Sequence, residues 1–211
     1  MKTQIYNIKA EKVGEATLPK EIFDVKISEK LISQAIRVYL ANQRSSYAKA
    51  KTRSDVAGTR QKVYAQKGTG RARHGNRTAP IFVGGGSAMG PDGLQNYKLK
   101  LSKKMKIVAI NSILTKFAQD KKILIIDSFE KLVPKTKEGI NVIAGLQAVN
   151  EVLSKSSKVG IINTETLTNV KRAFGNISGI NLLTLKSLNV YDLSNQNFLI
   201  LSQETVDNFS K

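Results

Sequence analysis

The 211-residue chain lacks cysteine, has a single histidine and is poor in acidic residues, with 16 against 34 lysines and arginines. Without cysteine it forms neither disulfides nor thiolate metal sites, which suits a reducing compartment. Its carboxylates show no metal-ligand clustering, so neither a metal nor any other cofactor is expected. No apolar run approaches the roughly eighteen residues of a membrane-spanning helix, and the N-terminus lacks the apolar core of a secretory signal. These absences favour a cytoplasmic protein without a membrane partner.

The excess of basic residues gives a formal net charge of +18 and a sequence pI of about 10.0. Such a balance indicates a polyanionic partner, either nucleic acid or an anionic membrane surface. No basic helix with a broad aromatic face is found, which argues against the membrane. A hydrophobic content of 41% with 24% charged residues is typical of a globular protein. We therefore expect one globular domain and a nucleic-acid partner.

The positive charge is concentrated in the middle of the chain. Nine of the fifteen glycines lie between Ser45 and Leu101, where no helical or strand period is sustained. Over positions 44–106, fifteen basic residues face only Asp55 and Asp92, so this stretch carries +13 and the remainder +5. A structureless stretch of this length is a functional arm or a disordered segment, and its self-repulsion is relieved when phosphates neutralise its cations. The basic residues are Arg44, Lys49, Lys51, Arg53, Arg60, Lys62, Lys67, Arg71, Arg73, Arg77, Lys98, Lys100, Lys103, Lys104 and Lys106.

The rest of the chain alternates between strand and helix patterns. An N-terminal strand pair is predicted from Gln4–Ile8 and residues 16–19, with a turn at Val13 and Gly14, and helices are expected after the caps Ser28 and Ser102. Fully apolar strands separated by helices predict an α/β fold, a single three-layer domain with a mostly parallel sheet flanked by helices. We expect residues 1–44 and 102–211 to form this domain and residues 45–101 to form an extended arm between two helices. Apolar patterns predict strands at 123–126, 158–162, 180–185 and 198–201, helices near 140–146 and 167–174, a turn near 188–193 and a terminal helix from 202.

Two glycine-rich stretches raise the hypothesis of nucleotide binding. Gly70–Arg77 has the G-x-x-x-x-G spacing of a P-loop, but the Lys-Ser/Thr pair is replaced and no strand precedes it. Gly84–Gly90 does not match G-x-G-x-x-G and lies inside the basic stretch. With no nucleophile elbow at Ser87 and only the lone His74, no catalytic residue is identified. We interpret the chain as a non-enzyme; a nucleotide-dependent enzyme with a basic insertion and a free RNA-binding regulator are the alternatives.

The centre of the arm, Gln66–Gly75, has the composition of an RNA clamp. Glycines at 68, 70 and 75 permit positive φ and close backbone approach, while Lys67, Arg71 and Arg73 supply charged donors for phosphates. A plain flexible linker needs no aromatic residues among its charges, whereas an RNA-binding segment uses them to stack on bases. The aromatic residues at these positions are Tyr64, His74 and Phe82.

Three lysines, Lys103, Lys104 and Lys106, fall in the first turn of the helix expected after Ser102. Cations at this end oppose the helix dipole by about 0.3 to 1 kcal/mol each. The alternatives are a solvated charged face and a phosphate site formed by the helix N-terminus together with the lysines. The adjoining basic arm favours the phosphate site.

Several of these motifs together resemble, in order and spacing, the bacterial type of the family of large-subunit ribosomal protein four. The match extends from the first helix through the arm to the α/β half. The sequence departs from the common pattern before the core, where Tyr64 and Ala65 replace Trp-Arg, and after it, where His74–Asn76 replaces small-Gly-Ser. The motifs are Lys51-Thr52-Arg53, Gln66–Arg73, Pro80, Gly84–Gly86, Gly90-Pro91 and Lys100–Lys104.

The resemblance implies a structural protein on the outer face of the large ribosomal subunit, bound to 23S-type rRNA. It implies that the arm reaches the peptide exit tunnel and meets a neighbouring ribosomal protein at the constriction, and that some members repress their own operon through its mRNA leader. The tunnel-lining tip would be Gln66, Lys67, Gly68, Thr69, Gly70, Arg71 and Ala72. The rRNA-binding residues would be Arg44, Lys49, Lys51, Arg53, Arg60, Lys62, Tyr64, Gln66, Lys67, Gly68, Gly70, Arg71, Arg73, His74, Arg77, Lys98, Lys100, Lys103, Lys104 and Lys106.

Overall fold

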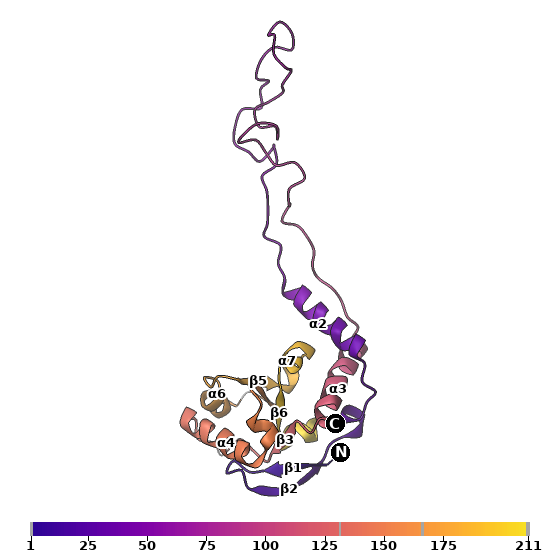
Figure 1. The fold of residues 1–211 in the computed structure, drawn as a ribbon, viewed down its shortest axis with the longest axis vertical. Coiled ribbons are helices and arrows are strands. Elements are labelled where there is room, and N and C mark those ends of the chain that lie inside the picture. Colours follow the sequence, from indigo (N-terminus) through magenta and orange to yellow (C-terminus); the bar gives the residue numbers. More distant parts are fainter. Residues whose placement is uncertain (1, 131, 166, 210–211) are drawn as a thin grey trace. The chain divides into compact units, whose positions relative to one another are not determined.

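The computed structural model describes residues 2–130, 132–165 and 167–209 (Figure 1). The chain divides into two compact units, one of residues 1–39 and 100–211 and the other of residues 40–99. The strands are β1 Lys2–Tyr6, β2 Lys12–Thr17, β3 Ile123–Ile126, β4 Val159–Asn163, β5 Ile180–Thr184 and β6 Phe198–Ser202. The helices are α1 Lys20–Phe23, α2 Glu29–Gln43, α3 Lys103–Gln119, α4 Thr136–Val149, α5 Glu151–Ser154, α6 Thr168–Phe174, α7 Val190–Ser194 and α8 Gln203–Phe209, with a 3-10 turn η1 at Leu185–Ser187.

The strands form one six-stranded sheet in the order β2-β1-β3-β6-β4-β5. Every neighbouring pair is parallel except β1 with β2, which is an antiparallel hairpin. In the centre of the sheet, Ile125 of β3 lies opposite Leu201 of β6, and Ile161 of β4 lies opposite Ile200. The prediction of a mostly parallel sheet is confirmed.

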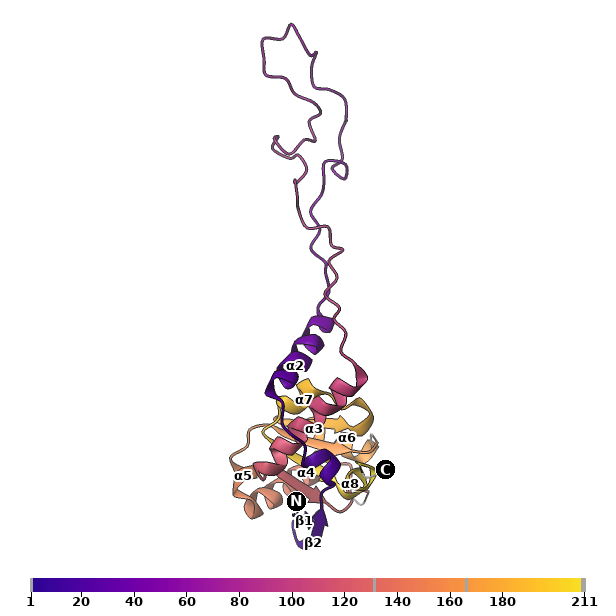
Figure 2. The ribbon, with the colours of Figure 1, turned by 90° about the vertical axis from the view of Figure 1, so that its right-hand side faces the viewer.

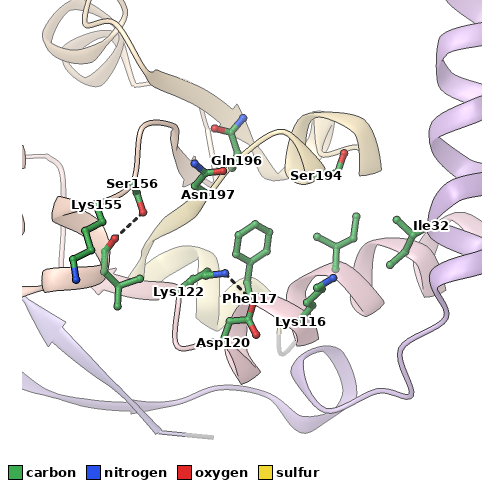
Figure 3. Close-up of a pocket in the computed structure, with 12 residues that line it drawn as sticks. Ile32, Lys116, Phe117, Asp120, Lys122, Lys155, Ser156, Ser194, Gln196 and Asn197 are labelled. Carbon is green, nitrogen blue, oxygen red and sulfur yellow. Dashed lines mark hydrogen bonds and ion pairs between the residues drawn. The ribbon is translucent and has the colours of Figure 1, made fainter.

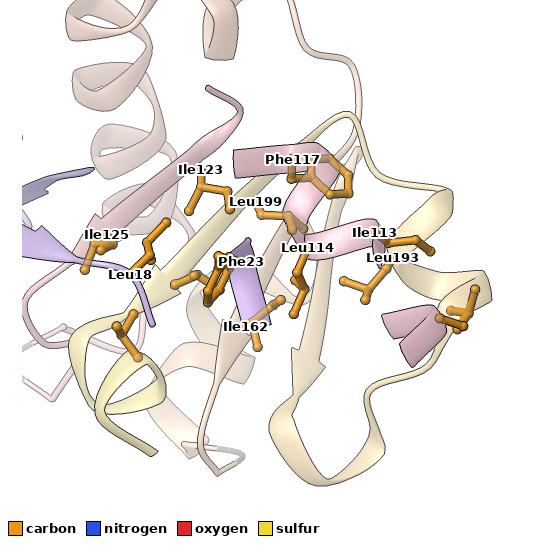
Figure 4. Close-up of a cluster of buried hydrophobic side chains, with 14 of the residues drawn as sticks. Leu18, Phe23, Ile113, Leu114, Phe117, Ile123, Ile125, Ile162, Leu193 and Leu199 are labelled. Carbon is orange, nitrogen blue, oxygen red and sulfur yellow. The ribbon is translucent and has the colours of Figure 1, made fainter. Parts of the chain in front are cut away.

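Helices cover both faces of the sheet, since every residue of its central strands β3, β4 and β6 is buried and most of them are apolar. Successive side chains of a strand point to opposite faces. In β6, Leu199 and Leu201 join a cluster with side chains of α1, α2, α3, α7 and α8, which Figure 4 shows around Leu114. Phe198 and Ile200 join a second cluster with α4, α5 and α6. The three-layer α/β fold is therefore confirmed.

The cap predicted for the second long helix is present. The Ser102 backbone is extended, with φ −64° and ψ 153°, and its Oγ accepts the N–H of Met105 at 3.3 Å, so α3 begins at Lys103. At the other end of α3, Leu114 and Phe117 are buried. The buried Oγ1 of Thr115 donates to the carbonyl of Ile22 at 3.1 Å and so fixes α1 against α3. The helix whose first turn carries the three lysines is therefore fixed in the globular unit.

Two local predictions were wrong. The first turn lies at Asn7–Glu11 rather than at residues 13–14, because Asn7 Oδ1 accepts the N–H groups of Lys9 and Glu11, both at 2.9 Å. Residues 190–194 form the helix α7 instead of a turn, since the Asn189 side chain accepts the N–H of Asp192 at 2.8 Å and caps it. The short helices α1 and α5 were not predicted.

Candidate nucleic-acid interface

The candidate interface is the basic arm, most of which forms the second unit. Residues 44–102, all of them described, contain no helix or strand and only one isolated bridge, between Lys49 and Asp92. The segment that leads toward the tip and the segment that returns from it run side by side in Figures 1 and 2.

A double hydrogen bond joins the two segments where they enter the arm. Asn42 Nδ2 donates to the carbonyl of Leu99 at 3.1 Å, and its Oδ1 accepts the N–H of the same residue at 2.9 Å. Two positions further along each segment, the Arg44 guanidinium lies 4.2 Å from the centre of the Tyr97 ring, a cation–π contact. The Asn42 side chain thus pairs with the Leu99 backbone as a neighbouring β-strand would, although the two residues lie 57 positions apart in the chain.

Further along, close backbone approach depends on glycine. Backbone hydrogen bonds of 2.8 Å run from the N–H of Ala50 to the carbonyl of Pro91 and from the N–H of Ser87 to that of Lys51. A Cβ on Gly86 would lie 2.2 Å from the backbone nitrogen of Arg53, well inside contact distance. The arm can therefore fold back on itself here only with glycine at position 86.

A compact turn follows, held by Asp55. Its Oδ2 accepts the Thr52 hydroxyl at 2.8 Å and the Thr52 N–H at 3.2 Å. These two hydrogen bonds, with a smaller contribution from the charge of Lys49, lower the pKa of Asp55 below its ordinary value. Asp55, one of the arm's two acidic residues, therefore stabilises its own loop.

The tip, Gln66–Ala72, is a closed loop. The Tyr64 hydroxyl donates to the carbonyl of Ala72, and the N–H of Val63 donates to the carbonyl of Gly75 at 3.0 Å. All seven tip residues are exposed. Gly68 and Gly70 adopt positive φ, 85° and 65°, as predicted, whereas Gly75 does not. A Cβ on Gly68, Gly70 or Gly75 would meet nothing within 4 Å, so the chain itself leaves the space beside these glycines open.

The three aromatic side chains expected to stack on bases lie next to one another in the arm, with His74 contacting both of the others. The His74 ring lies between Tyr64 at 6.0 Å, edge-on, and Phe82 at 5.1 Å. Tyr64, His74 and Phe82 are half-buried, and His74 Nδ1 has no hydrogen-bond partner among the described residues. These rings form a small internal cluster whose faces are only partly available to RNA.

The predicted basic residues are all accessible. Each of the fifteen lysines and arginines between positions 44 and 106 is exposed, and within the described part of the chain none forms an ion pair. Eleven belong to the arm unit, while Lys100, Lys103, Lys104 and Lys106 belong to the other unit. The structure does not bring them to a single point. They form an extended series of cations free to meet phosphates.

Three of these cations do share a hollow. Arg53, Arg60 and Lys62 line, with Gly75, a concavity of about 390 Å³. Arg60 Nη2 donates to the carbonyl of Ser54 at 2.9 Å, which fixes the direction of its guanidinium. Such a fork of donors suits a phosphate group.

Sequence reasoning missed the exposed apolar side chains of the arm. Tyr47, Val83, Met89 and Leu94 expose 88%, 106%, 106% and 87% of their surface. The signal was present in the isolated hydrophobic residues between the charges. Single exposed apolar side chains are common on protein surfaces, so these four do not by themselves mark a contact with a partner.

The described residues give no support to the other classes of site. They contain no group of three or more histidine, aspartate or glutamate side chains that could hold a metal. None of the helices so described is both long and apolar enough for a membrane span. Fold and site therefore define an α/β protein with a cationic arm whose basic residues form no ion pair among the described residues, an arrangement typical of RNA-associated proteins.

Comparison with known proteins identifies the family. A model of the Ribosomal protein L4/L1 family matches residues 16–211. The chain is 39% identical over 205 residues to the large ribosomal subunit protein uL4 of Natranaerobius thermophilus, covering 97% of this chain and 95% of the relative. It is 35% identical over 202 residues to the uL4 protein of Desulforudis audaxviator, with 96% and 94% covered, and 34% identical over 205 residues to that of Clostridium botulinum, with 97% and 95% covered. The chain belongs to the Ribosomal protein L4/L1 family.

Membership of this family confirms the expected resemblance and the non-enzymatic, structural role in translation. The nucleotide-dependent enzyme is thereby excluded. The relatives also confirm the expected location on the cytoplasmic ribosome.

Proposed function

We propose that the chain is a structural constituent of the large ribosomal subunit that binds and scaffolds 23S-type rRNA through an arm of residues 45–101. Residues 1–44 and 102–211 form the domain that anchors this arm. The observation that carries the proposal is the series of fifteen exposed cations without ion-pair partners in the described chain. Each cation that neutralises a phosphate releases condensed counterions, which drives binding.

The closed loop at Gln66–Ala72 is the segment proposed to line the polypeptide exit tunnel beside a neighbouring ribosomal protein. Its exposure and its hydrogen-bonded closure by Tyr64 support this role. A wall for a moving peptide needs small or polar residues that do not retain it, and Gly68, Thr69 and Gly70 satisfy that need. Lys67→Glu should change the rRNA footprint and the macrolide sensitivity of the ribosome while the globular unit stays folded. An unchanged footprint together with unchanged sensitivity would remove Lys67 from the tunnel wall.

The test of the whole proposal is retention on the large subunit in a high-salt sucrose gradient. The intact tagged protein should remain at one copy per subunit, because an arm enclosed by rRNA stays in place where a basic protein held only by surface phosphate contacts washes off as the salt rises. A version in which residues 45–101 are replaced by a short Gly-Ser linker should wash off at lower salt. Release of the intact protein into the soluble fraction would contradict the proposal.

The same cations suit the leader of the protein's own operon mRNA, which has the same phosphate backbone. Repression of that operon is accordingly part of the proposal, and a reporter fused to the leader tests it. Repression by the intact protein but not by the arm-deleted version is expected. A protein that represses but never sediments with ribosomes would instead be the free regulator.

A further inference from the structure

The globular unit has a second feature that rRNA binding by the arm does not use. A groove of about 470 Å³ lies beside the amino-terminal ends of the strands β3, β4 and β6. Its walls come from α2, α3, α5 and the segments that precede β4 and β6. In Figure 3, Lys155 lies at one end and Ile32 at the other, with the Phe117 ring between them. The groove is thus elongated.

Much of the groove lining is apolar. Phe117 and Ile113 of α3 are 8% and 5% exposed, and Ile32 of α2 and Val152 of α5 complete this surface. Val152 exposes 40% of its surface. Covering such a surface with another apolar group contributes about 25 cal/mol per Å².

Most polar groups of the lining already have partners within the chain. The Lys122 ammonium lies 2.9 Å from Asp120, Ser156 Oγ donates to the carbonyl of Val152 at 2.8 Å, and Ser194 Oγ donates to that of Tyr191 at 2.9 Å. The Gln196 and Asn197 amides also donate within the unit. Two charges remain: among the described residues, neither the Lys116 nor the Lys155 ammonium has a carboxylate partner or an acceptor.

From this arrangement we propose that the groove is a docking site for an extended acidic segment of a partner protein, with apolar side chains flanked by aspartate or glutamate. Apolar side chains would cover Phe117 and Val152, and carboxylates would pair with Lys116 and Lys155. RNA fits less well, because phosphates would use the two ammoniums but leave the apolar lining in water.

The test measures binding of a fluorescein-labelled decapeptide, with two leucines flanked by glutamates, to the full chain. The assay is run at about 0.3 M salt, where weak contacts with the basic arm are largely screened. Lys116→Glu with Lys155→Glu should raise the Kd at least tenfold, and a peptide with serine in place of leucine should bind at least tenfold more weakly. The matched control, Lys137→Glu with Lys171→Glu, makes the same charge change on α4 and α6 and should alter the Kd by less than twofold.

Further measurements distinguish the occupants. A benzophenone group on the peptide should cross-link to residues 113–122 or 152–156, and melting curves should be unchanged because both lysines are exposed and unpaired in the described chain. Equal weakening by the groove and control pairs would overturn the proposal, as would absence of saturable binding. If the groove pair weakens a ten-nucleotide oligouridylate but not the peptide, the site belongs to RNA.

Discussion

The charge series of the arm predicts a definite change in the salt dependence of RNA binding. Lys51, Arg53, Arg71 and Arg73 are exposed, and their side chains make no hydrogen bond or ion pair within the described residues. Substituting all four by glutamine therefore removes positive charge without breaking the arm's own contacts. The variant isolates the phosphate contribution.

The magnitude follows from counterion release. Each phosphate contact contributes about 0.7 to 0.9 to the slope of log K against log salt concentration, so four contacts contribute about 3. Over a fourfold rise in salt, the intact protein should lose about 60-fold more affinity than the variant, since four to the power of about 3 is about 60. At low salt the variant should bind more weakly.

The assay is filter binding of a 23S rRNA fragment between about 0.05 and 0.2 M salt, the range in which such slopes are usually compared. The matched control replaces Lys20, Lys135, Lys137 and Lys171, four exposed lysines of the globular unit, by glutamine. Its slope should change by less than 1. If the arm variant keeps the intact slope, these four cations do not contact phosphates and the reasoning from charge fails.

Three further results are expected. The Asp55 pKa should lie below its ordinary 3.8, so that its turn is held above this pH and loosens as the pH falls through the lowered value; NMR titration should give a higher pKa in Thr52→Ala. Gly86→Ala should disturb the amide spectrum of the arm, since the Cβ would lie 2.2 Å from a backbone nitrogen, while Gly75→Ala should not. Leu146→Ala, fully buried under the sheet, should cost about 2 to 5 kcal/mol in urea unfolding, and a smaller loss would mean that the site collapses around the cavity.

The sheet was predictable because its central strands are buried on both faces. Such strands must be apolar throughout, so Ile123–Ile126 and Phe198–Leu201 stand out in the sequence without knowledge of their neighbours. The turn at Asn7–Glu11 was missed because it depends on the Asn7 side chain, which accepts two N–H groups. The glycine in Val13-Gly14 suggested a turn by residue type alone. Short helices such as α7 likewise depend on a single cap.

The lack of helix and strand between residues 44 and 102 was predictable for a different reason, since charge and glycine content are properties of composition. The contacts inside the arm were not, because they join residues far apart in the chain. Asn42 meets Leu99, and Tyr64 meets His74 and indirectly Phe82, with no local signal that pairs them. The sequence predicted that Tyr64, His74 and Phe82 stack on bases, and only the structure shows that His74 contacts the other two rings.

The two units offset the entropy cost of ordering their backbones in different ways. The globular unit buries two apolar clusters on the faces of its sheet, which offsets a backbone entropy cost of about 1 to 2 kcal/mol per residue. The arm has no comparable cluster among its described residues, and Val83 and Met89 are fully exposed. Its cations also repel one another. The arm must therefore draw most of its ordering free energy from a partner, so salt that screens phosphates should loosen the arm on the ribosome long before it unfolds the domain.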